Sequence, residues 1–361
     1  MSARRSLLAG VFALLGAACT IMNGLKLDPS ATEPTPGDDD DDDDVTRPDG
    51  SSKDGDPETP CTPKHVHPPP PAAAGGTDRE LVFALQEMDS TPSDRRAGLD
   101  LDGRCSCHDD LPPTCTSKTG AVTCDPEDGT GLDNIAGTSF AALLSTTGGF
   151  NMISLANARI QNGQHGNVFR IEGYNGLDDD DDVKVTFHPS PGRGSGNVNF
   201  TQVQSWPIGP GVVATKAYVA KRQLVALFDS IQIFFLEDTF QPATLRHATL
   251  FGDIVDVGGD LRLPDVQVAG RANTTELVAS IGQIETPLGT VCYAPTYEST
   301  GSSACNASDL PASPAEDGTA AACDSFSMAM RLKLIPATLG NSASIPTVFD
   351  RCNGAPKVVC N

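Results

Sequence analysis

Apolar and polar residues alternate through much of the chain after residue 160, and this alternation is typical of β-strands with one buried face. It is clearest at 168–174 (VFRIEGY), 183–187 (VKVTF) and 230–238 (SIQIFFLED). Further strand-length segments lie at intervals of roughly ten residues and are separated by Pro or Gly. They are NVNFTQVQ, KAYVAKRQLVALF, ATLFGDIVDV and LRLPDVQVAG. This spacing predicts a mainly β domain of antiparallel sheets, arranged as a sandwich or a jelly roll.

Two segments have the period of a helix instead of a strand. Residues 151–162 and 274–281 space their apolar side chains by three or four positions, which places them on one helix face. The first segment is followed by Gly163, and glycine is common just beyond a helix C-terminus. We therefore expect a few helices beside the sheets.

The N-terminus has the features of an export signal. Arg4 and Arg5 precede an uncharged apolar run that ends at Ala18 and is too short to span a bilayer. We therefore predict that residues 1–18 are a signal peptide. The small residues before Cys19 resemble a bacterial lipobox, in which the cysteine is lipidated and becomes the new N-terminus. Cleavage to a soluble secreted protein is the alternative, and the arginine pair also resembles a twin-arginine signal.

Residues 19–76 have the composition of a tether. They carry 13 Asp or Glu against 4 Lys or Arg, and a run of prolines follows the acidic stretch. Such a segment has little to bury and repels itself, so we predict an extended spacer between a lipidated Cys19 and a head domain, residues 77–361. Metal binding by the acidic run 38–44 or by the HVH triplet is the less favoured interpretation.

Net charge narrows the classes of partner that the chain can bind. The chain has a formal net charge of −22, and the head alone has 34 Asp or Glu against 19 Lys or Arg. This balance argues against nucleic acid as a partner. No apolar run after the signal approaches the roughly 20 residues of a transmembrane helix, so a lipid on Cys19 is the expected membrane contact. The predicted location is the outer membrane, facing the periplasm or the cell surface.

The cysteines predict a disulfide framework. The chain has 11, and setting Cys19 aside for a lipid leaves an even number, as full pairing in an oxidising compartment requires. The remaining cysteines are Cys61, Cys105, Cys107, Cys115, Cys124, Cys292, Cys305, Cys323, Cys352 and Cys360. Five precede residue 125 and five follow residue 291, so full pairing requires at least one bridge between the two groups. We expect Cys61 to cross, because the other early cysteines can pair locally. Its partner could be any of the five late cysteines, and Cys323 is the one we select.

The segment 99–110 (LDLDGRCSCHDD) combines carboxylates, cysteines and a histidine. An EF-hand loop has its glycine at position six, and placing Gly103 there puts Gly98 where the first carboxylate ligand must stand. A zinc site would use Cys105, Cys107, His108 and Cys115. The C-x-C spacing is tighter than that of common zinc ligand pairs, and an oxidising compartment also disfavours zinc. We interpret the segment as two disulfide anchors in an acidic turn.

Two other acidic segments could supply the oxygen ligands that calcium prefers. They are 124–134 (CDPEDGTGLDN) and 174–185 (YNGLDDDDDVKV). The second lies between two predicted strands, so its carboxylates could converge from a hairpin loop, although solvated turns explain both segments without a metal. The predicted calcium ligands, and the one cofactor considered, are at Asp178, Asp179, Asp180, Asp181 and Asp182.

Catalytic motifs are absent from the sequence. It contains neither a G-x-S-x-G nucleophile elbow nor an H-E-x-x-H zinc motif, and we assign no catalytic residue. The interpretation that follows is a non-enzymatic binding or structural module of the cell envelope, with an extracellular ligand or an envelope partner. The alternative is a secreted hydrolase acting on extracellular polymer, because a pair of catalytic carboxylates needs only proximity in space.

Several motifs carry a resemblance to a known family. They are LDLDGRCSC, CDPEDGTGLDN, RIEGYNGLDDDDDVKV, GTVCYAPTY and CDSFSMAMRL, and together they extend over most of residues 80–360. These motifs resemble a family of lipoproteins from large-genome Gram-negative bacteria. That family carries no assigned activity, so the resemblance implies location and architecture only.

Overall fold

The computed structural model describes part of the chain. The described residues are 66–72, 78–89, 98–105, 113–117, 131–137, 152–194, 198–234, 242–286, 289–345, 350–355 and 357–360. Contacts divide the chain after Gly55, and all of these residues belong to the second unit. The predicted signal peptide, Cys19 and most of the predicted tether lie outside the described residues, as do Cys61, Cys107 and Cys124. Within the described ranges, every helix is too short or too polar to cross a bilayer.

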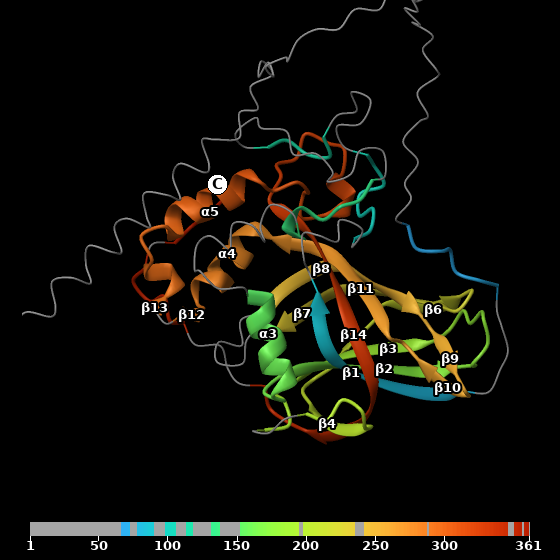
Figure 1. Cartoon of the computed structure of the whole chain (residues 1–361). Coiled ribbons are helices and arrows are strands. Elements are labelled where there is room, and N and C mark those ends of the chain that lie inside the picture. The colour runs from blue at the N-terminus through green and yellow to red at the C-terminus, as the bar shows by residue number, and fades with distance from the viewer. Residues whose placement is uncertain are drawn as a thin grey trace, which may run out of the picture. The chain divides into compact units, whose positions relative to one another are not determined.

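The described strands form one large sheet that curls into a half-barrel (Figure 1). Its strands are β1 (Arg79–Asp89), β2 (Gly166–Tyr174), β3 (Lys184–Ser190), β4 (Gln204–Ile208), β5 (Val212–Val213), β6 (Lys216–Ala220), β7 (Gln223–Phe234), β8 (Pro242–Asp253), β11 (Asp265–Asn273) and β14 (Ser325–Ser342). The order is β5-β3-β2-β1-β14-β11-β8-β7-β6, and all neighbours along it are antiparallel. The remaining strand, β4, pairs with β14 in parallel.

Smaller elements complete the described part of the fold. Two ribbons pair β9 (Val255–Val257) with β10 (Asp260–Arg262) and β12 (Glu285–Thr286) with β13 (Gly289–Thr290). The helices are α3 (Met152–Gln161), α4 (Thr274–Gly282) and α5 (Tyr297–Asn306), with 3₁₀ turns at Val291–Tyr293 and Pro314–Glu316.

The main core lies on one face of the sheet and includes side chains of all three helices. Phe169 of β2 and its cross-strand partner Phe187 of β3 are fully buried, with ring centroids 5.1 Å apart in an edge-to-face arrangement. Ile160 of α3 and Leu277 of α4 belong to the same cluster. Burying each side chain of this size stabilises the fold by roughly 1.5–3 kcal/mol, so this face holds most of the apolar driving force.

The opposite face of the sheet, called the outer face, carries three smaller apolar clusters. Side-chain alternation produces the two faces, because Phe83 and Leu85 of β1 belong to the main core while Ala84 does not. The outer clusters are centred on Trp206, Leu99 and Tyr218. Segments outside the regular sheet, among them residues 99–101, pack on this face.

The predicted helices are confirmed. The segment 151–162 contains α3, and Gly163 after it has φ 71°, a conformation that favours glycine. The segment 274–281 lies within α4, where the Asn273 side chain accepts a hydrogen bond from the backbone N–H of Glu276 at 3.1 Å. Sequence periodicity and capping chemistry therefore agree at both helices.

The mainly β, antiparallel character is confirmed, whereas a sandwich or jelly roll is not shown. The described strands form one curled sheet and two small ribbons. The strand expected at NVNFTQVQ is wrong, because its described residues 198–203 lie outside any strand and β4 begins only at Gln204. The segment KAYVAKRQLVALF is a hairpin of β6 and β7, whose two turn residues Lys221 and Arg222 have φ 52° and 65°.

Three disulfides lie among the described residues: Cys115–Cys323, Cys292–Cys352 and Cys305–Cys360. The first joins the early and late groups of cysteines, so the bridge required by parity is present. The expected Cys61–Cys323 pairing is wrong, because Cys323 is bonded to Cys115. Local pairing of Cys115 is wrong for the same reason. Proximity along the chain misled this prediction because the fold brings 113–117 against 321–323 by backbone hydrogen bonds.

Candidate metal centre

Residues 99–102, called here the LDLD stretch, lie across the outer face of the sheet. Their side chains point alternately toward the sheet and away from it. Leu99 packs with Ala269 of β11 and Ala329 of β14, which are direct cross-strand partners, and Leu101 joins the same cluster. Successive side chains of an extended segment point to opposite sides. The leucines anchor the segment on the sheet, and the intervening aspartates are left on the side away from that cluster.

A second segment, 131–137, brings a third carboxylate beside these two. Leu99 and Asp133 form an antiparallel bridge, in which the N–H of Asp133 donates to the carbonyl of Leu99 at 3.0 Å. The side chain of Asp133 in turn accepts a hydrogen bond from the N–H of Leu101 at 2.6 Å. Asp133 is 1% exposed, so its carboxylate is held inside the protein beside the LDLD stretch.

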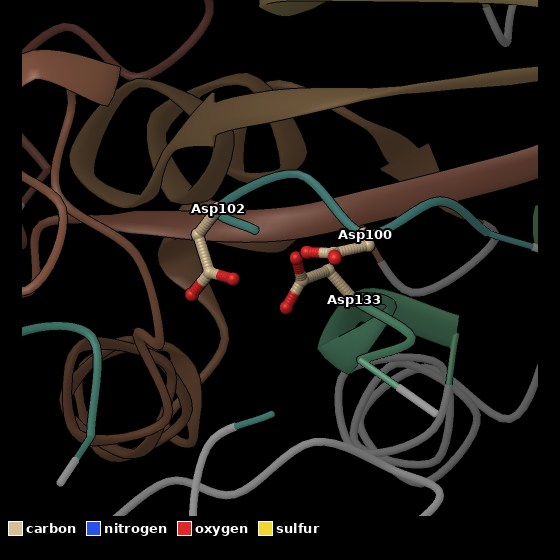
Figure 2. A group of neighbouring side chains, drawn as sticks. All are labelled: Asp100, Asp102 and Asp133. Atoms are coloured by element: carbon tan, nitrogen blue, oxygen red, sulfur yellow. The ribbon is translucent and has the colours of Figure 1, made fainter. Parts of the chain in front are cut away.

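Asp100, Asp102 and Asp133, called here the aspartate cluster, each offer one oxygen, and these oxygens all lie within 4.8 Å of one another. Figure 2 shows the carboxylates of Asp100 and Asp133 close together, with that of Asp102 on the same side. Two oxygens on opposite sides of a calcium ion at about 2.4 Å would be about 4.8 Å apart, so this spacing fits a shared cation. Within the described parts of the chain, this is the only such group of ligands.

Hydrogen bonds fix the aspartate cluster but leave one buried oxygen without a partner. Oδ1 of Asp100 accepts from the N–H groups of Gly103 and Arg104 at 2.6 and 3.2 Å. Oδ1 of Asp102 accepts from Arg104 at 2.8 Å, and its Oδ2 accepts from the hydroxyl of Thr114. Oδ2 of Asp100 is buried and has no hydrogen-bond partner. A buried carboxylate oxygen in this state is costly unless a cation or water satisfies it.

The electrostatics of the cluster also favour a cation. Burial, followed by the charge of Asp102, raises the pKa of Asp100 to about 6. The pKa of Asp102 is raised as well, mainly by burial and in smaller part by the charge of Asp317. A pKa rises when the charged form is poorly stabilised by its surroundings. A divalent cation would supply the missing stabilisation of these carboxylates.

A buried arginine of the sheet binds the backbone of the LDLD stretch. Arg271 of β11 is 1% exposed and donates from Nη2 to the carbonyl of Leu101 at 3.0 Å. Its guanidinium also forms a bidentate pair with Asp317, at 2.7 and 2.5 Å, and donates to the carbonyl of Pro311 at 2.9 Å. Arg271 thus connects the sheet, the LDLD stretch and the 311–317 turn, and the neutralising partner of its charge is Asp317.

The segment that carries Asp133 is held by β14. Ser327 donates a hydrogen bond to Asp309 and accepts one from the N–H of Ile135 at 2.8 Å. Asn134 accepts from the N–H of Ala329 at 3.0 Å. Burial raises the pKa of Asp309 to about 7, and both of its oxygens accept from Ser327. Asp309 is therefore part of the scaffold behind the aspartate cluster.

The predicted calcium loop at Asp178–Asp182 contacts the β6–β7 turn. Asp178 pairs with Arg222 at 2.6 Å, and Asp179 accepts from the backbone N–H of Lys221 at 2.8 Å. These contacts hold two turn residues that have positive φ without being glycine. The carboxylates of this part of the loop thus have protein partners.

Asp180 links the β2–β3 loop to the edge strand β6 of the same sheet. It exchanges two backbone hydrogen bonds with Val219 of the edge strand β6, at 2.8 and 2.7 Å, and its buried carboxylate accepts from Asn175 at 2.7 Å. The loop between β2 and β3 therefore binds the opposite end of the sheet. Calcium at Asp178–Asp182 stays a prediction, and the contacts of this loop give it a structural role that needs no metal.

The zinc interpretation of the LDLDGRCSC region is wrong. Cys105 and Cys115 are both disulfide-bonded, so neither can supply a thiolate ligand. Cys107 and His108 lie outside the described residues. The disulfide anchor at Cys105 is confirmed. The acidic turn beside it also contributes two carboxylates to a cluster that the sequence alone did not predict. The three carboxylates come from two acidic segments that are separate in the sequence, and only the fold brings these segments together.

Comparison with known proteins identifies no relative of this chain. No family model, no curated protein and no solved structure matches it. Its covalent chemistry is informative instead, because disulfides form and persist in oxidising compartments. The three described bridges and the bonded Cys105 are consistent with an extracytoplasmic location.

Proposed function

We propose that this protein is an exported, non-enzymatic module of the cell envelope, in which calcium binds the aspartate cluster and fixes two surface segments on the sheet. The buried, unpartnered Oδ2 of Asp100 among three converging carboxylates carries the proposal. The cation would join the LDLD stretch to 131–137 at the point where their backbones already pair.

The chemistry of the donors favours calcium over other cations. All of the clustered ligand atoms are carboxylate oxygens, which suit hard cations and not the softer zinc or copper. The carboxylates come from irregular segments, and calcium accepts flexible geometry more readily than magnesium does. Extracellular calcium modules bind with dissociation constants of about 10⁻⁴–10⁻³ M, and we expect an affinity in this range.

The surroundings of Asp309, a carboxyl whose pKa burial raises to about 7, favour a binding or structural role over hydrolysis. A catalytic acid must reach its substrate, but both oxygens of Asp309 accept hydrogen bonds from Ser327. The proposed tethering through a lipid on Cys19 is supported by the export signal, the lipobox-like residues and the acidic, proline-rich segment that follows. The ligand of the module would bind at the cell envelope.

Calcium titration of matched variants tests this function. The full-length chain without its signal is melted in EDTA and at about 100 times the calcium dissociation constant, a ratio that stabilises a single-site protein by about 2.7 kcal/mol. Asp100→Asn with Asp133→Asn should abolish the calcium-dependent rise in Tm. The matched control is Asp179→Asn with Asp181→Asn, which changes the same residue type in the other acidic loop.

The two variants separate the possible results. Loss of the rise in the first variant with its retention in the second supports calcium at the aspartate cluster. The reverse pattern moves calcium to the Asp178–Asp182 loop, and the absence of any rise in the unchanged protein refutes calcium binding. Isothermal titration with magnesium and zinc completes the test, because binding of either one tighter than calcium contradicts the assignment.

A further inference from the structure

A proline-rich part of the predicted tether lies against the outer face of the sheet. The hydroxyl of Tyr218, on the edge strand β6, donates to the carbonyl of Pro68 at 2.6 Å. Nδ1 of His67 is 2.9 Å from the same hydroxyl oxygen, and the two rings meet edge-on with centroids 6.3 Å apart. Tyr218 is 1% exposed, so its ring is covered. This part of the predicted spacer therefore contacts the head.

The chemistry of the segment suits recognition of an extended chain. Residues 68–71 are four consecutive prolines, which fix φ near −65° and lack N–H groups. Such a run adopts the polyproline II helix, and its carbonyls are free to accept hydrogen bonds from a binding surface. Because the run is already stiff, ordering it costs little conformational entropy. Aromatic residues with a donor group are the usual partners of these helices.

A row of apolar residues extends from Tyr218 across three strands of the outer face. Tyr218 of β6 is the cross-strand partner of Val225 of β7, which is the partner of Phe251 of β8. Ala220 and Leu227 belong to the same outer cluster. The row therefore provides a continuous apolar strip that begins at Tyr218, the residue whose hydroxyl binds Pro68.

We propose that Tyr218 and this outer cluster form a polyproline-recognition site, and that its resident ligand is the chain's own segment His67–Pro71. The site joins His67 and Pro68 to the edge strand β6 of the head. It is independent of the aspartate cluster and does not require calcium. A proline-rich peptide with the same sequence would compete for it.

Peptide binding to the full chain tests this proposal. The probe is a fluorescein-labelled peptide, KHVHPPPPA, measured by fluorescence anisotropy. Changing Pro68, Pro69, Pro70 and Pro71 all to Ser frees the site, so the peptide should bind this variant at least about tenfold tighter than the unchanged chain, in which the segment competes at an effective concentration of roughly 1 mM. A peptide with its prolines replaced by serine should not bind.

The hydroxyl of Tyr218 is tested in the same four-serine background. Tyr218→Phe should weaken peptide binding about fivefold, the effect of one hydrogen bond of about 1 kcal/mol. Tyr293→Phe is the matched control, since the hydroxyl of Tyr293 donates to the carbonyl of Asn353 at 2.9 Å, away from the outer cluster. Absence of binding at roughly 1 mM peptide, or equal effects of the two Phe variants, overturns the proposal. A proline-dependent dimer in sedimentation overturns the assignment of the chain's own segment as ligand.

Discussion

Removal of the Cys115–Cys323 bridge should destabilise the head more than removal of either of the other described bridges. The bridge closes 208 residues, whereas Cys305–Cys360 closes 55. In the chain-entropy model, these loops restrict the unfolded chain by about 5.4 and about 4.2 kcal/mol respectively. The expected difference between the two double alanine variants is therefore about 1 kcal/mol, and strain in the native state lowers both values.

The burial of Cys115 and Cys323 should further increase the loss of stability when their bridge is removed. Cys115 and Cys323 are 2% and 4% exposed, so their replacement by alanine also removes buried apolar surface. The bridge also lies next to Thr114, which donates to Asp102 of the aspartate cluster. The Cys115→Ala, Cys323→Ala variant should consequently lose part of its calcium affinity, whereas the Cys305→Ala, Cys360→Ala variant should not.

Equilibrium unfolding in urea measures the effect. Trp206 is the single tryptophan of the chain and is fully buried, so its fluorescence reports unfolding of the sheet. The m value should rise when the long loop is opened, since the unfolded chain then exposes more surface. If the variant without Cys115–Cys323 is as stable as the variant without Cys305–Cys360, loop closure is not the source of the stabilisation and the reasoning fails.

Three further predictions concern charge, pH and location. Arg271→Leu should cost about 3–5 kcal/mol in urea unfolding, because it leaves Asp317 as a buried charge without its partner, and the added change Asp317→Asn should recover part of the loss. Burial raises the pKa of Asp309 from 3.8 to about 7, so its contribution to stability is full below about pH 4 and is lost as the pH rises through about 7. Asp309→Asn should flatten the dependence of stability on pH between pH 5 and 8, and an unchanged curve would contradict the role of this carboxyl. Cys19→Ala should release the protein from the membrane fraction, and retention there would place the anchor elsewhere.

The sequence predicted the elements whose local signals agree with the fold. The 274–281 helix has both an apolar face and a capping asparagine, and the strands β2 and β3 alternate clearly. The two central strands β1 and β14 were missed. The sequence of β1, RELVFALQEMD, is rich in residues that favour helices, and β14 contains Ala, Met, Leu and Lys in similar proportion. Pairing with neighbours on both sides overrides these local preferences.

The candidate site shows a different limit of sequence reasoning. Asp100 and Asp102 share one side of an extended stretch, as the LDLD alternation implies, but the third ligand comes from a separate acidic segment. Comparison with an EF-hand tests only ligands within one loop, and therefore could not detect a cluster built from two. The Asp178–Asp182 run attracted attention by its density of charge, yet density of charge in sequence does not imply convergence in space.

The pairing of β1 with β14 has a consequence for how the protein is made. These strands are neighbours at the centre of the sheet, with Phe83 opposite Pro336, about 250 residues apart in sequence. The sheet therefore cannot be completed until nearly the whole chain has been synthesised, and such non-local pairing folds slowly. A chain that emerges N-terminus first remains without its central strand during most of its synthesis. Under the export proposed above, this delay would leave the polypeptide unfolded for passage across the membrane, and its cysteines would be oxidised in the compartment beyond.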